Sequence, residues 1–386
     1  MKLCFVCPHA YPLFNPESPG LPGGTELQMY NLSRFSASQD DMAVDFVVAD
    51  QGQKDGERYD NVRVWKCFVP KADPSTTGKL LLVTKLFTVL ARSRADIYVA
   101  SPAGPLVGLI AIFCRIFGRR FIYRTAHQID CDGSYEKQNG WRGRLYGRGL
   151  RAADAIVTQN IEHRQILADR GITSEIIRNA FRIEDASTPP PERSVDALWI
   201  ARCVSWKNPD MFVDLAREIA DRSFVMICRP DPEHAELFDS IAQRARLVPN
   251  LRFIPGAPPE EASAWFARSR SFVGTSEYEG FPNTFLQACM AGTPVLSYNV
   301  NPDGFITRYA VGAFAGGRFD RLVESTRALL VEQAQWDACS QNARSYVEKH
   351  HNIEVEGRKW MRLFQTLHAR GSMKAHSPER ANGAGD

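Results

Sequence analysis

Residues 271–298, SFVGTSEYEGFPNTFLQACMAGTPVLSY, decide the fold of this chain. An apolar run at Phe272 and Val273 predicts a strand, a polar turn follows it, and a short helical pattern then ends at Gly292. Residues 295–298 predict a second strand. This order is typical of a βαβ unit, whose strands run parallel and whose connection crosses the carboxyl edge of the sheet.

The start of the predicted helix suits an anion. A first helical turn presents unpaired N–H groups and the positive end of a dipole, so it stabilises a diphosphate without a metal. Pro282 fits an early helical position because its missing N–H would have no partner there, and Asn283 and Thr284 follow it. Glu279 comes just before the helix, where its carboxylate can reach hydroxyl groups attached to the phosphate. These residues predict a site for a phosphate-bearing sugar.

This stretch resembles the signature of glycosyltransferase family 4, which has the GT-B fold. In that family one glutamate contacts the donor sugar, and a second glutamate eight residues later binds the ribose. This chain has Glu279 at the first position and Gln287 at the second. An amide still donates and accepts hydrogen bonds, so the resemblance implies that Gln287 contacts the ribose. A capping box with Thr284 is the alternative, in which Gln287 touches no ligand. The resemblance is carried by Ser276-x-x-Glu279-Gly280-Phe281, by Gln287 and by Ala291-Gly292-x-Pro294-Val295.

Length and composition indicate a soluble protein of two domains. The chain has 386 residues, and single hydrophobic cores stop growing at about 250–300 residues. Its nine cysteines are an odd number without a secretory signal, which favours reduced thiols and a cytoplasmic location, including the inner face of the membrane. Cys4 and Cys7 fall in an apolar first strand, where buried structural thiols are expected instead of a redox pair.

The alternation of strand and helix patterns predicts an α/β fold with two Rossmann-like, doubly wound domains. The prolines between Pro8 and Pro22, and the polar segment 50–61, predict irregular structure. The resemblance implies a central cleft and a terminal helix that crosses back to the first domain. We expect an acceptor-binding domain at 1–183, a linker at 184–194, a nucleotide-sugar-binding domain at 195–353, the crossover helix at 354–370 and a disordered tail at 371–386.

The first domain carries two predicted site elements. Gly23 and Gly24 follow the first strand and resemble the Gly-Gly loop that lies against donor phosphate and acceptor in the family; glycines needed only for the turn are the alternative. His127 directly follows strand 120–125, and the resemblance implies that it lies beside the reacting sugar instead of bracing a loop. Asp130 and Asp132 are expected in a solvated loop, and contact with the acceptor is the alternative.

The second domain carries a basic pair. Arg202 and Lys207 follow its first strand and resemble the pair that clamps the donor diphosphate in the family. A surface charge pair is the alternative, but a position at the same sheet edge as Glu279 favours binding. Both a guanidinium fork and an ammonium group suit phosphate. The resemblance also implies that Gly256 packs against the nucleobase, and we expect Arg229 near it.

The net charge of +3 conceals a basic region. Residues 79–151 contain 13 Lys and Arg but four Asp and Glu, a net charge of +9. A basic amphipathic surface can hold a protein on an anionic leaflet, and a solvated basic face is the alternative. The charges in segment 141–153 are Arg142, Arg144, Arg148 and Arg151.

The resemblance implies a retaining, metal-independent hexosyltransferase. It would move a sugar from a UDP- or GDP-linked donor to a saccharide or lipid-linked acceptor in cell-surface polysaccharide synthesis, with Glu279 and His127 as catalytic residues. The diphosphate would contact Arg202, Lys207, Gly23, Gly24, Asn283 and Thr284, and the rest of the donor would contact Gly280, Phe281, Gln287, Arg229 and Gly256. No Asp-x-Asp motif stands in a position to bind a metal, so no metal is expected. No other cofactor and no nucleic-acid partner is expected either. The alternatives are a GT-B-fold nucleotide-sugar epimerase and a non-catalytic sugar-nucleotide binding protein.

Overall fold

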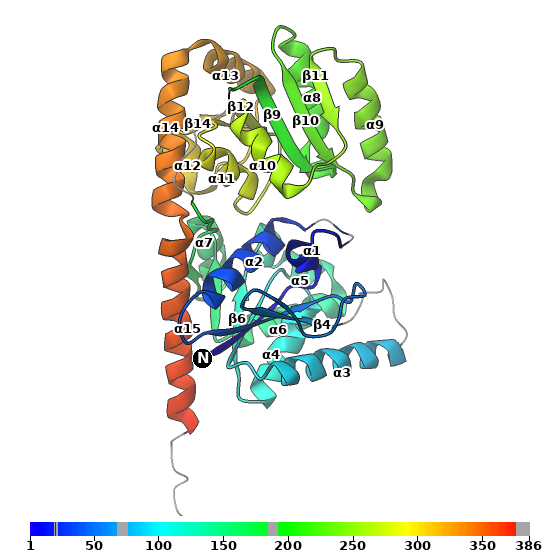
Figure 1. Ribbon diagram of the computed structural model, residues 1–386, viewed down its shortest axis with the longest axis vertical. Helices are drawn as coiled ribbons and strands as arrows, with labels where there is room; N and C mark the ends of the chain where they lie inside the picture. Colours follow the sequence, from blue (N-terminus) through cyan, green and yellow to red (C-terminus); the bar gives the residue numbers. More distant parts are fainter. Residues whose placement is uncertain (19, 21, 68–75, 184–191, 376–386) are drawn as a thin grey trace, which may run out of the picture. The chain divides into compact units, whose positions relative to one another are not determined.

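The computed structural model describes the chain except residues 19, 21, 68–75, 184–191 and 376–386. The chain divides into two compact units, each built on its own parallel sheet (Figure 1). The first unit comprises Met1–Ala180 and Ile353–Asp386, and the second comprises Phe181–Asn352. The α/β fold with two doubly wound domains is therefore the one that the alternating pattern predicts.

The sheet of the first unit has the strand order β3-β4-β2-β1-β5-β6-β7-β8. All neighbouring strands pair in parallel except β3 and β4. From β1 the chain moves outward to β2 and β4 and then returns to β5 on the other side of β1, so the topological switch point lies between β1 and β5. The strands are β1 (Lys2–Val6), β2 (Ala43–Val48), β3 (Glu57–Tyr59), β4 (Val62–Lys66), β5 (Ile97–Ala100), β6 (Arg120–Arg124), β7 (Ala155–Thr158) and β8 (Glu175–Ile176).

Helices cover both faces of this sheet (Figure 1). One face packs with α2 and α15 in a core that contains Phe5, Cys7 and Phe364, and the other packs with α3, α4 and α6 in a core that contains Cys4 and Phe113. The two thiols of the first strand are thus buried on opposite faces, as structural residues. The helices are α1 (Tyr11–Phe14), α2 (Gly24–Ala37), α3 (Thr76–Ser93), α4 (Pro105–Ile116), α5 (Ser134–Gln138), α6 (Gly140–Ala152), α7 (Ile161–Asp169) and α15 (Ile353–Ala375).

The two irregular segments expected near the N-terminus are partly regular. Residues 8–14 form the 3₁₀ turn η1 (Pro8–Ala10) and the short helix α1, because Pro8 and Pro12 occupy first-turn positions where no N–H partner is needed. Segment 50–61 contains the strand β3, which pairs with β4. The hydroxyl of Tyr11 donates to Glu57 at 3.1 Å and supports this strand from the first helix.

The expected domain boundaries also need correction. The second unit begins at Phe181, whose amide donates to the carbonyl of His351 at 2.9 Å and so ties both ends of the unit together. The terminal helix α15 belongs to the first unit and continues through the expected tail as far as Ala375. Most of the expected linker (184–191) and the rest of the expected tail (376–386) lie outside the described residues.

Helices α4 and α6 pack backbone against backbone. A Cβ atom on Gly108 would lie 2.3 Å from the carbonyl oxygen of Leu145, and one on Gly149 would lie 2.6 Å from the Cα of Gly108. Two glycines therefore set the separation of the helices.

We expect Gly108→Val to lower the free energy of unfolding by about 3 kcal/mol, because the added side chain forces the helices apart. Urea denaturation measures this loss. Gly104→Val is the control, since a Cβ on Gly104 meets nothing within 4 Å. Equal stability of the two variants would contradict the close packing of α4 and α6.

The second unit has a fully parallel sheet with the order β11-β10-β9-β12-β13-β14. Its switch point lies between β9 and β12, because the chain leaves β9 toward β11 and returns to β12 on the other side. The strand β14 and the helix α12 were not predicted from the sequence. The elements are β9 (Val195–Arg202), α8 (Pro209–Glu218), β10 (Phe224–Arg229), α9 (Ala235–Arg246), β11 (Leu251–Ile254), α10 (Pro259–Ala267), β12 (Ser269–Gly274), α11 (Asn283–Met290), β13 (Val295–Ser297), α12 (Phe305–Arg308), β14 (Gly312–Phe314), α13 (Phe319–Val331) and α14 (Gln333–His350).

Candidate functional site

The candidate site lies at the switch point of the second unit, where β9 and β12 end side by side. Phe272 of β12 pairs with Leu198 of β9, so both strands present their carboxyl ends at one edge. After β9 the chain forms the 3₁₀ turn η3 (Ser205–Lys207), and after β12 it turns into α11. Ligands of parallel sheets bind at such edges, so the two connections form the expected site.

Hydrogen bonds join the two connections. The indole of Trp199 donates to the hydroxyl of Thr275 at 2.8 Å, and that hydroxyl donates to the carbonyl of Lys207 at 2.6 Å. The amide of Glu277 donates to the carbonyl of Trp206 at 2.9 Å. The backbone around Lys207 is therefore fixed against the turn that carries Glu279.

Lys207 and Glu279 form an ion pair across the switch point. The ammonium group of Lys207 contacts Oε1 of Glu279, and the hydroxyl of Ser276 donates to the same oxygen at 2.8 Å. The Glu279 side chain is 8% exposed, so the carboxylate is held in one orientation. The structure thus brings together the predicted phosphate-binding lysine and the predicted sugar-binding glutamate.

Arg202, at the end of β9, faces the loop that follows β10. Its Nη1 lies 3.5 Å from Oδ2 of Asp231, and its side chain is 47% exposed, which leaves donors available to a ligand. Nδ1 of His234 lies 3.2 Å from the other oxygen of Asp231. Burial would raise the pKa of Asp231, but hydrogen bonds from His234 and the Glu233 amide and the charge of Arg202 outweigh it and lower that pKa.

Sequence reasoning missed Asp231 and His234. Asp231 caps the 3₁₀ turn η4 (Pro232–His234) by accepting the amide of Glu233 at 3.0 Å. The Asp-Pro pair after a predicted strand carries this capping signal. Nothing in the sequence indicates that the same carboxylate meets Arg202 from the neighbouring strand.

The residues expected near the base lie together. Arg229 ends β10, and Gly256 follows the neighbouring strand β11 with a φ of +86°, a left-handed conformation that favours glycine. A Cβ atom on Gly256 would lie 3.8 Å from Cγ of Arg229. The rings of Trp206, in η3, and Tyr278, next to Glu279, stack with centroids 6.3 Å apart, a feature that the sequence did not indicate.

Helix α11 begins at Asn283, with Pro282 as its N-cap, so Pro282 precedes the helix instead of lying in its first turn. Thr284 therefore lies inside the helix, and the capping box considered for Gln287 is wrong. Asn283, Thr284 and Gln287 are half-buried, whereas Phe285 is buried. Because Asn283 and Gln287 are one turn apart, they lie on the same face of the helix.

The ring of Phe281 packs in the core of the second unit. The expected contact of Phe281 with the donor is therefore wrong for its side chain. The side chain is 5% exposed and packs against Phe305 and His351, with ring centroids 5.2 and 4.9 Å away. The residue before it, Gly280, is buried as well. Gly280 and Phe281 therefore anchor the turn in the core, while Glu279 remains at the sheet edge.

The glycine turn of the first unit ends at the N-terminus of α2. Gly23 is the N-cap, and its amide donates to the carboxylate of Glu26 at 2.9 Å, while Gly24 is exposed. The turn comes after β1, η1 and α1 in the chain, and it belongs to the first unit.

His127 is exposed and directly follows β6. Its amide and that of Ala126 donate to the carboxylate of Asp130 at 3.2 and 2.6 Å. Asp130 is fully buried, and burial raises its pKa, so the expectation of a solvated position is wrong for this residue. Asp130 braces the loop and leaves the ring of His127 on the surface.

His163, on α7, is 3% exposed, and burial together with the charge of His127 lowers its pKa from 6.5 to about 4. The folded protein therefore keeps this imidazole neutral at pH values where the unfolded chain protonates it. Between pH 6.5 and about 4 the unfolded state binds more protons, so stability falls as the pH is lowered through this range.

We expect this single group to reduce the free energy of unfolding by about 3 kcal/mol between pH 7 and pH 4. The measurement is denaturant unfolding across this range for the wild type and His163→Gln, whose profile should be flatter by that amount. His9→Gln, at an exposed position, is the control. Parallel profiles for the wild type and His163→Gln would contradict the prediction.

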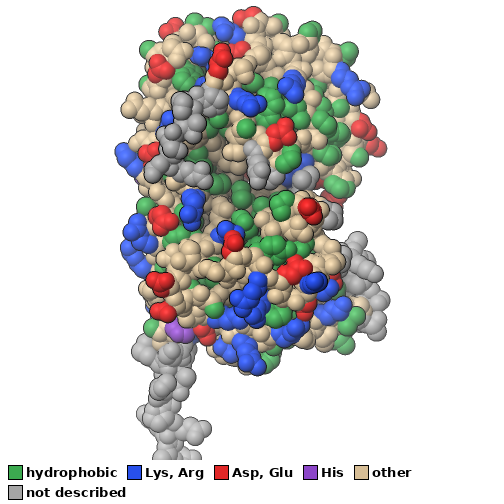
Figure 2. All heavy atoms as spheres, viewed as in Figure 1, with side chains coloured by type: hydrophobic (Ala, Val, Ile, Leu, Met, Phe, Trp, Pro, Cys, Tyr) green, Lys and Arg blue, Asp and Glu red, His purple; other side chains and the backbone are tan. Residues whose placement is uncertain are grey.

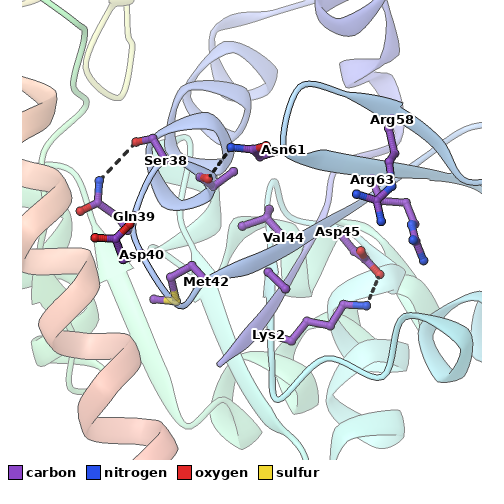
Figure 3. A pocket seen from close by; sticks show the side chains of 12 residues that line it. Lys2, Ser38, Gln39, Asp40, Met42, Val44, Asp45, Arg58, Asn61 and Arg63 are labelled. Carbon is purple, nitrogen blue, oxygen red and sulfur yellow. Dashed lines mark hydrogen bonds and ion pairs between the residues drawn. The ribbon is translucent and has the colours of Figure 1, made fainter.

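A hollow of about 420 Å³ in the first unit lies away from these strand ends (Figure 3). It is lined by residues at the amino ends of β1 and β2, including Lys2 and Asp45, which form an ion pair at 2.9 Å. Ligands of parallel sheets bind at the opposite, carboxyl edge. We therefore do not assign this hollow to the candidate site.

Residues 181–346, nearly the whole second unit, match the family model described as Glycosyl transferases group 1. No curated protein matches the chain.

Solved structures resemble the whole fold. Sucrose-phosphate synthase from Thermosynechococcus elongatus has a TM-score of 0.75 at 15% identity, covering 96% of this chain and 100% of that one. HepE from Anabaena, in complex with UDP and glucose, has a TM-score of 0.75 at 15% identity, covering 95% and 99%. WaaG, a glycosyltransferase involved in lipopolysaccharide biosynthesis, has a TM-score of 0.66 at 14% identity, covering 92% and 98%.

Within the described residues, no helix combines the length and the apolar character needed to cross a membrane. None of the nine cysteines, all of which lie within the described residues, forms a disulfide. The second unit is thus similar to group 1 glycosyltransferases, and the chain has the α/β architecture, with two parallel-sheet domains, of GT-B glycosyltransferases.

Proposed function

We propose that the protein is a retaining glycosyltransferase of family 4 that moves a hexosyl group from a UDP- or GDP-linked donor to a saccharide or lipid-linked acceptor. The observation that carries the proposal is the ion pair of Lys207 with Glu279 across the switch point, with Arg202 at the end of β9, in a unit that matches group 1 glycosyltransferases. Two cations and a carboxylate at a strand edge suit a sugar diphosphate.

In the proposed reaction the bond between the anomeric carbon and the diphosphate oxygen breaks, and a bond to an acceptor hydroxyl oxygen forms. Negative charge develops on the departing diphosphate, where Arg202, Lys207 and the first amides of α11 stabilise it. A phosphate oxygen takes the proton of the acceptor hydroxyl. This charge stabilisation comes from the chain alone, so the reaction is drawn without a metal.

Glu279 positions the donor sugar in this scheme. Its carboxylate is fixed by Ser276 and Lys207, and it accepts hydrogen bonds from sugar hydroxyls once the diphosphate occupies Lys207. Gln287 is proposed to bond the ribose, and Arg229 and Gly256 are proposed to pack near the base. Gly23 and Gly24 are proposed to contact the donor phosphate, and His127 the reacting sugar.

A donor screen tests the function. Purified protein is titrated with UDP-, GDP- and ADP-linked sugars, and binding is followed by thermal shift; membrane extract is then added and release of nucleoside diphosphate is measured. We expect one base to stabilise the protein and release to depend on acceptor. Acceptor-independent rearrangement of the donor would favour the epimerase alternative, and binding without release would favour a sugar-nucleotide binding protein.

We further propose that the basic region contacts an anionic membrane. The apolar side of α6, including Tyr146 and Leu150, packs inward, so the amphipathic helix does not offer an apolar face. Besides Trp141 at the start of α6, the exposed apolar residues come from α3 and the end of α4, among them Leu80, Leu81 and Ile116. Figure 2 shows Lys and Arg side chains gathered on the lower part of the visible face, on the first unit.

Vesicle sedimentation tests this contact. We expect the protein to bind vesicles of anionic lipid and to remain free of vesicles of neutral lipid. The exposed Arg144 and Arg148 lie on the outer side of α6, so Arg144→Glu with Arg148→Glu should weaken binding. Binding that is independent of lipid charge and of these residues would support a solvated basic face.

A further inference from the structure

A buried arginine lies at the carboxyl edge of the first unit's sheet. Arg124, the last residue of β6, is 3% exposed. Its Nη2 donates to the side-chain oxygen of Asn179, but its Nη1 is buried without a hydrogen-bond partner among the residues that the structure describes. Burying a charged group with unused donors is strongly unfavourable, so the burial of Arg124 needs a compensating interaction.

A half-buried arginine elsewhere shows what a structural role looks like. Arg193 of the second unit gives its donors to oxygens of Ser269, Thr293, Ala291 and Gly292. Arg124 has a single neutral partner in the described chain and no ion pair there. Burial lowers its pKa to about 10, so the guanidinium stays charged at neutral pH.

Arg124 belongs to a row of residues next to the switch point. Val6 pairs with Ala100 and Ala100 pairs with Tyr123, so the next residues, Cys7, Ser101 and Arg124, end three neighbouring strands in line. Side chains alternate along a strand, so these three share the sheet face of Phe5, Val99 and Ile122, which lie in one core.

Ser101 adds a second unused group to this row. Its side chain is 3% exposed, and its hydroxyl has no hydrogen-bond partner within the described residues. An arginine fork and a hydroxyl on neighbouring strands can together supply three donors to one anionic group.

The Cys7 thiol of this row responds to the charge of Glu26, in the first turn of α2, as well as to that of Arg124. Burial and the charge of Glu26 raise the pKa of the thiol, and the charge of Arg124 lowers it. Glu26 in turn accepts the amide of Gly23. The crevice outside the strand ends at a switch point is where parallel sheets bind ligands.

We propose that Arg124 and Ser101 bind an anionic group, a phosphate or a carboxylate, at the switch point of the first unit. The guanidinium fork of Arg124 pairs with two oxygens, and the Ser101 hydroxyl donates to the anion. Where the ligand is the sugar acceptor, the inference rests on the proposed function, and the acceptor must then carry a negative charge.

Calorimetric titration with inorganic phosphate tests the site. The background protein carries Arg202→Ala and Lys207→Ala, which removes the basic pair of the candidate site in the second unit. We expect one phosphate per chain, at least about tenfold weaker binding after Arg124→Met and about threefold to tenfold weaker binding after Ser101→Ala. Undiminished binding in both variants would overturn the proposal.

Thermal unfolding separates a binding role from a structural one. If Arg124 is kept for a ligand, Arg124→Met leaves the Tm unchanged or raises it, because it removes an uncompensated buried charge. A fall as large as that of Arg193→Met would overturn the proposal.

Two further experiments show where the anionic group comes from and test the site apart from the proposed function. In the first, transfer to a soluble sugar phosphate and transfer to a lipid-linked saccharide diphosphate are measured for the wild type and Arg124→Met. Loss of transfer in the variant with either acceptor identifies that acceptor as a source of the anion and supports the site, whereas an equal loss with an uncharged saccharide overturns the link between the site and the acceptor. If the wild type binds phosphate through Arg124 but binds no nucleoside diphosphate, the site stands and the proposed function fails.

Discussion

Lys207→Met is expected to lower kcat/KM for sugar transfer by about 100- to 1,000-fold, the loss typical of removing one preorganised group that stabilises transition-state charge. Lys207 is held at the switch point by the bond from Thr275 to its carbonyl and by its ion pair with Glu279. Its ammonium group is therefore in place before the donor binds. Steady-state kinetics with the donor found in the screen gives the measurement.

The ion pair between Lys207 and Glu279 leads to a second expected result, on the binding of nucleoside diphosphate. A diphosphate must compete with Glu279 for Lys207, so Glu279→Gln should bind free nucleoside diphosphate several-fold more tightly while transfer falls. Glu277→Gln is the matched control, because Glu277 is exposed and accepts from Asn208 at 3.3 Å. Tighter binding in the control, or unchanged binding in Glu279→Gln, would contradict competition for the lysine.

Arg193→Met is expected to destabilise the second unit by about 4 kcal/mol, because it removes four hydrogen bonds that the charged, half-buried guanidinium donates. The guanidinium donates to the Thr293 hydroxyl and the Ala291 carbonyl at 2.8 Å, and it also stacks over the ring of Trp336, 4.8 Å from its centroid. Burial, with the charges of Arg344 and Arg270, lowers its pKa to about 10, so it stays charged at pH 7.

Chemical denaturation of the isolated variants measures this effect. Arg217→Met is the control, since Arg217 is half-exposed and its ion pair with Asp214 spans 3.4 Å, so a change below about 1 kcal/mol is expected. Similar stabilities for the two variants would show that the network around Arg193 contributes little.

Much of the fold follows from local signals in the sequence. The buried strands appear as short apolar runs, and the residues that follow them mark the carboxyl edge of each sheet. This is why Lys207 and Glu279 could be placed at one edge before the structure was known. Arg193 escaped notice because its segment is polar and proline-rich, and its partners lie 76 to 100 positions away.

The limits of the prediction at the site have a similar cause. The spacing of the motif does not reveal which side chains of a tight turn face the core, so Phe281 was assigned to the ligand although its ring packs on Phe305. The meeting of Arg202 with Asp231 depends on the pairing of β9 with β10, which is not encoded locally. The unused donors of Arg124 likewise become visible only in three dimensions.

The most direct test of the central claim is acceptor-dependent release of nucleoside diphosphate by the wild type and by Glu279→Ala, with the best donor of the screen. A donor site built around the second unit's switch point predicts release by the wild type and a loss of at least about 100-fold in the variant. Equal release by both proteins would contradict the account.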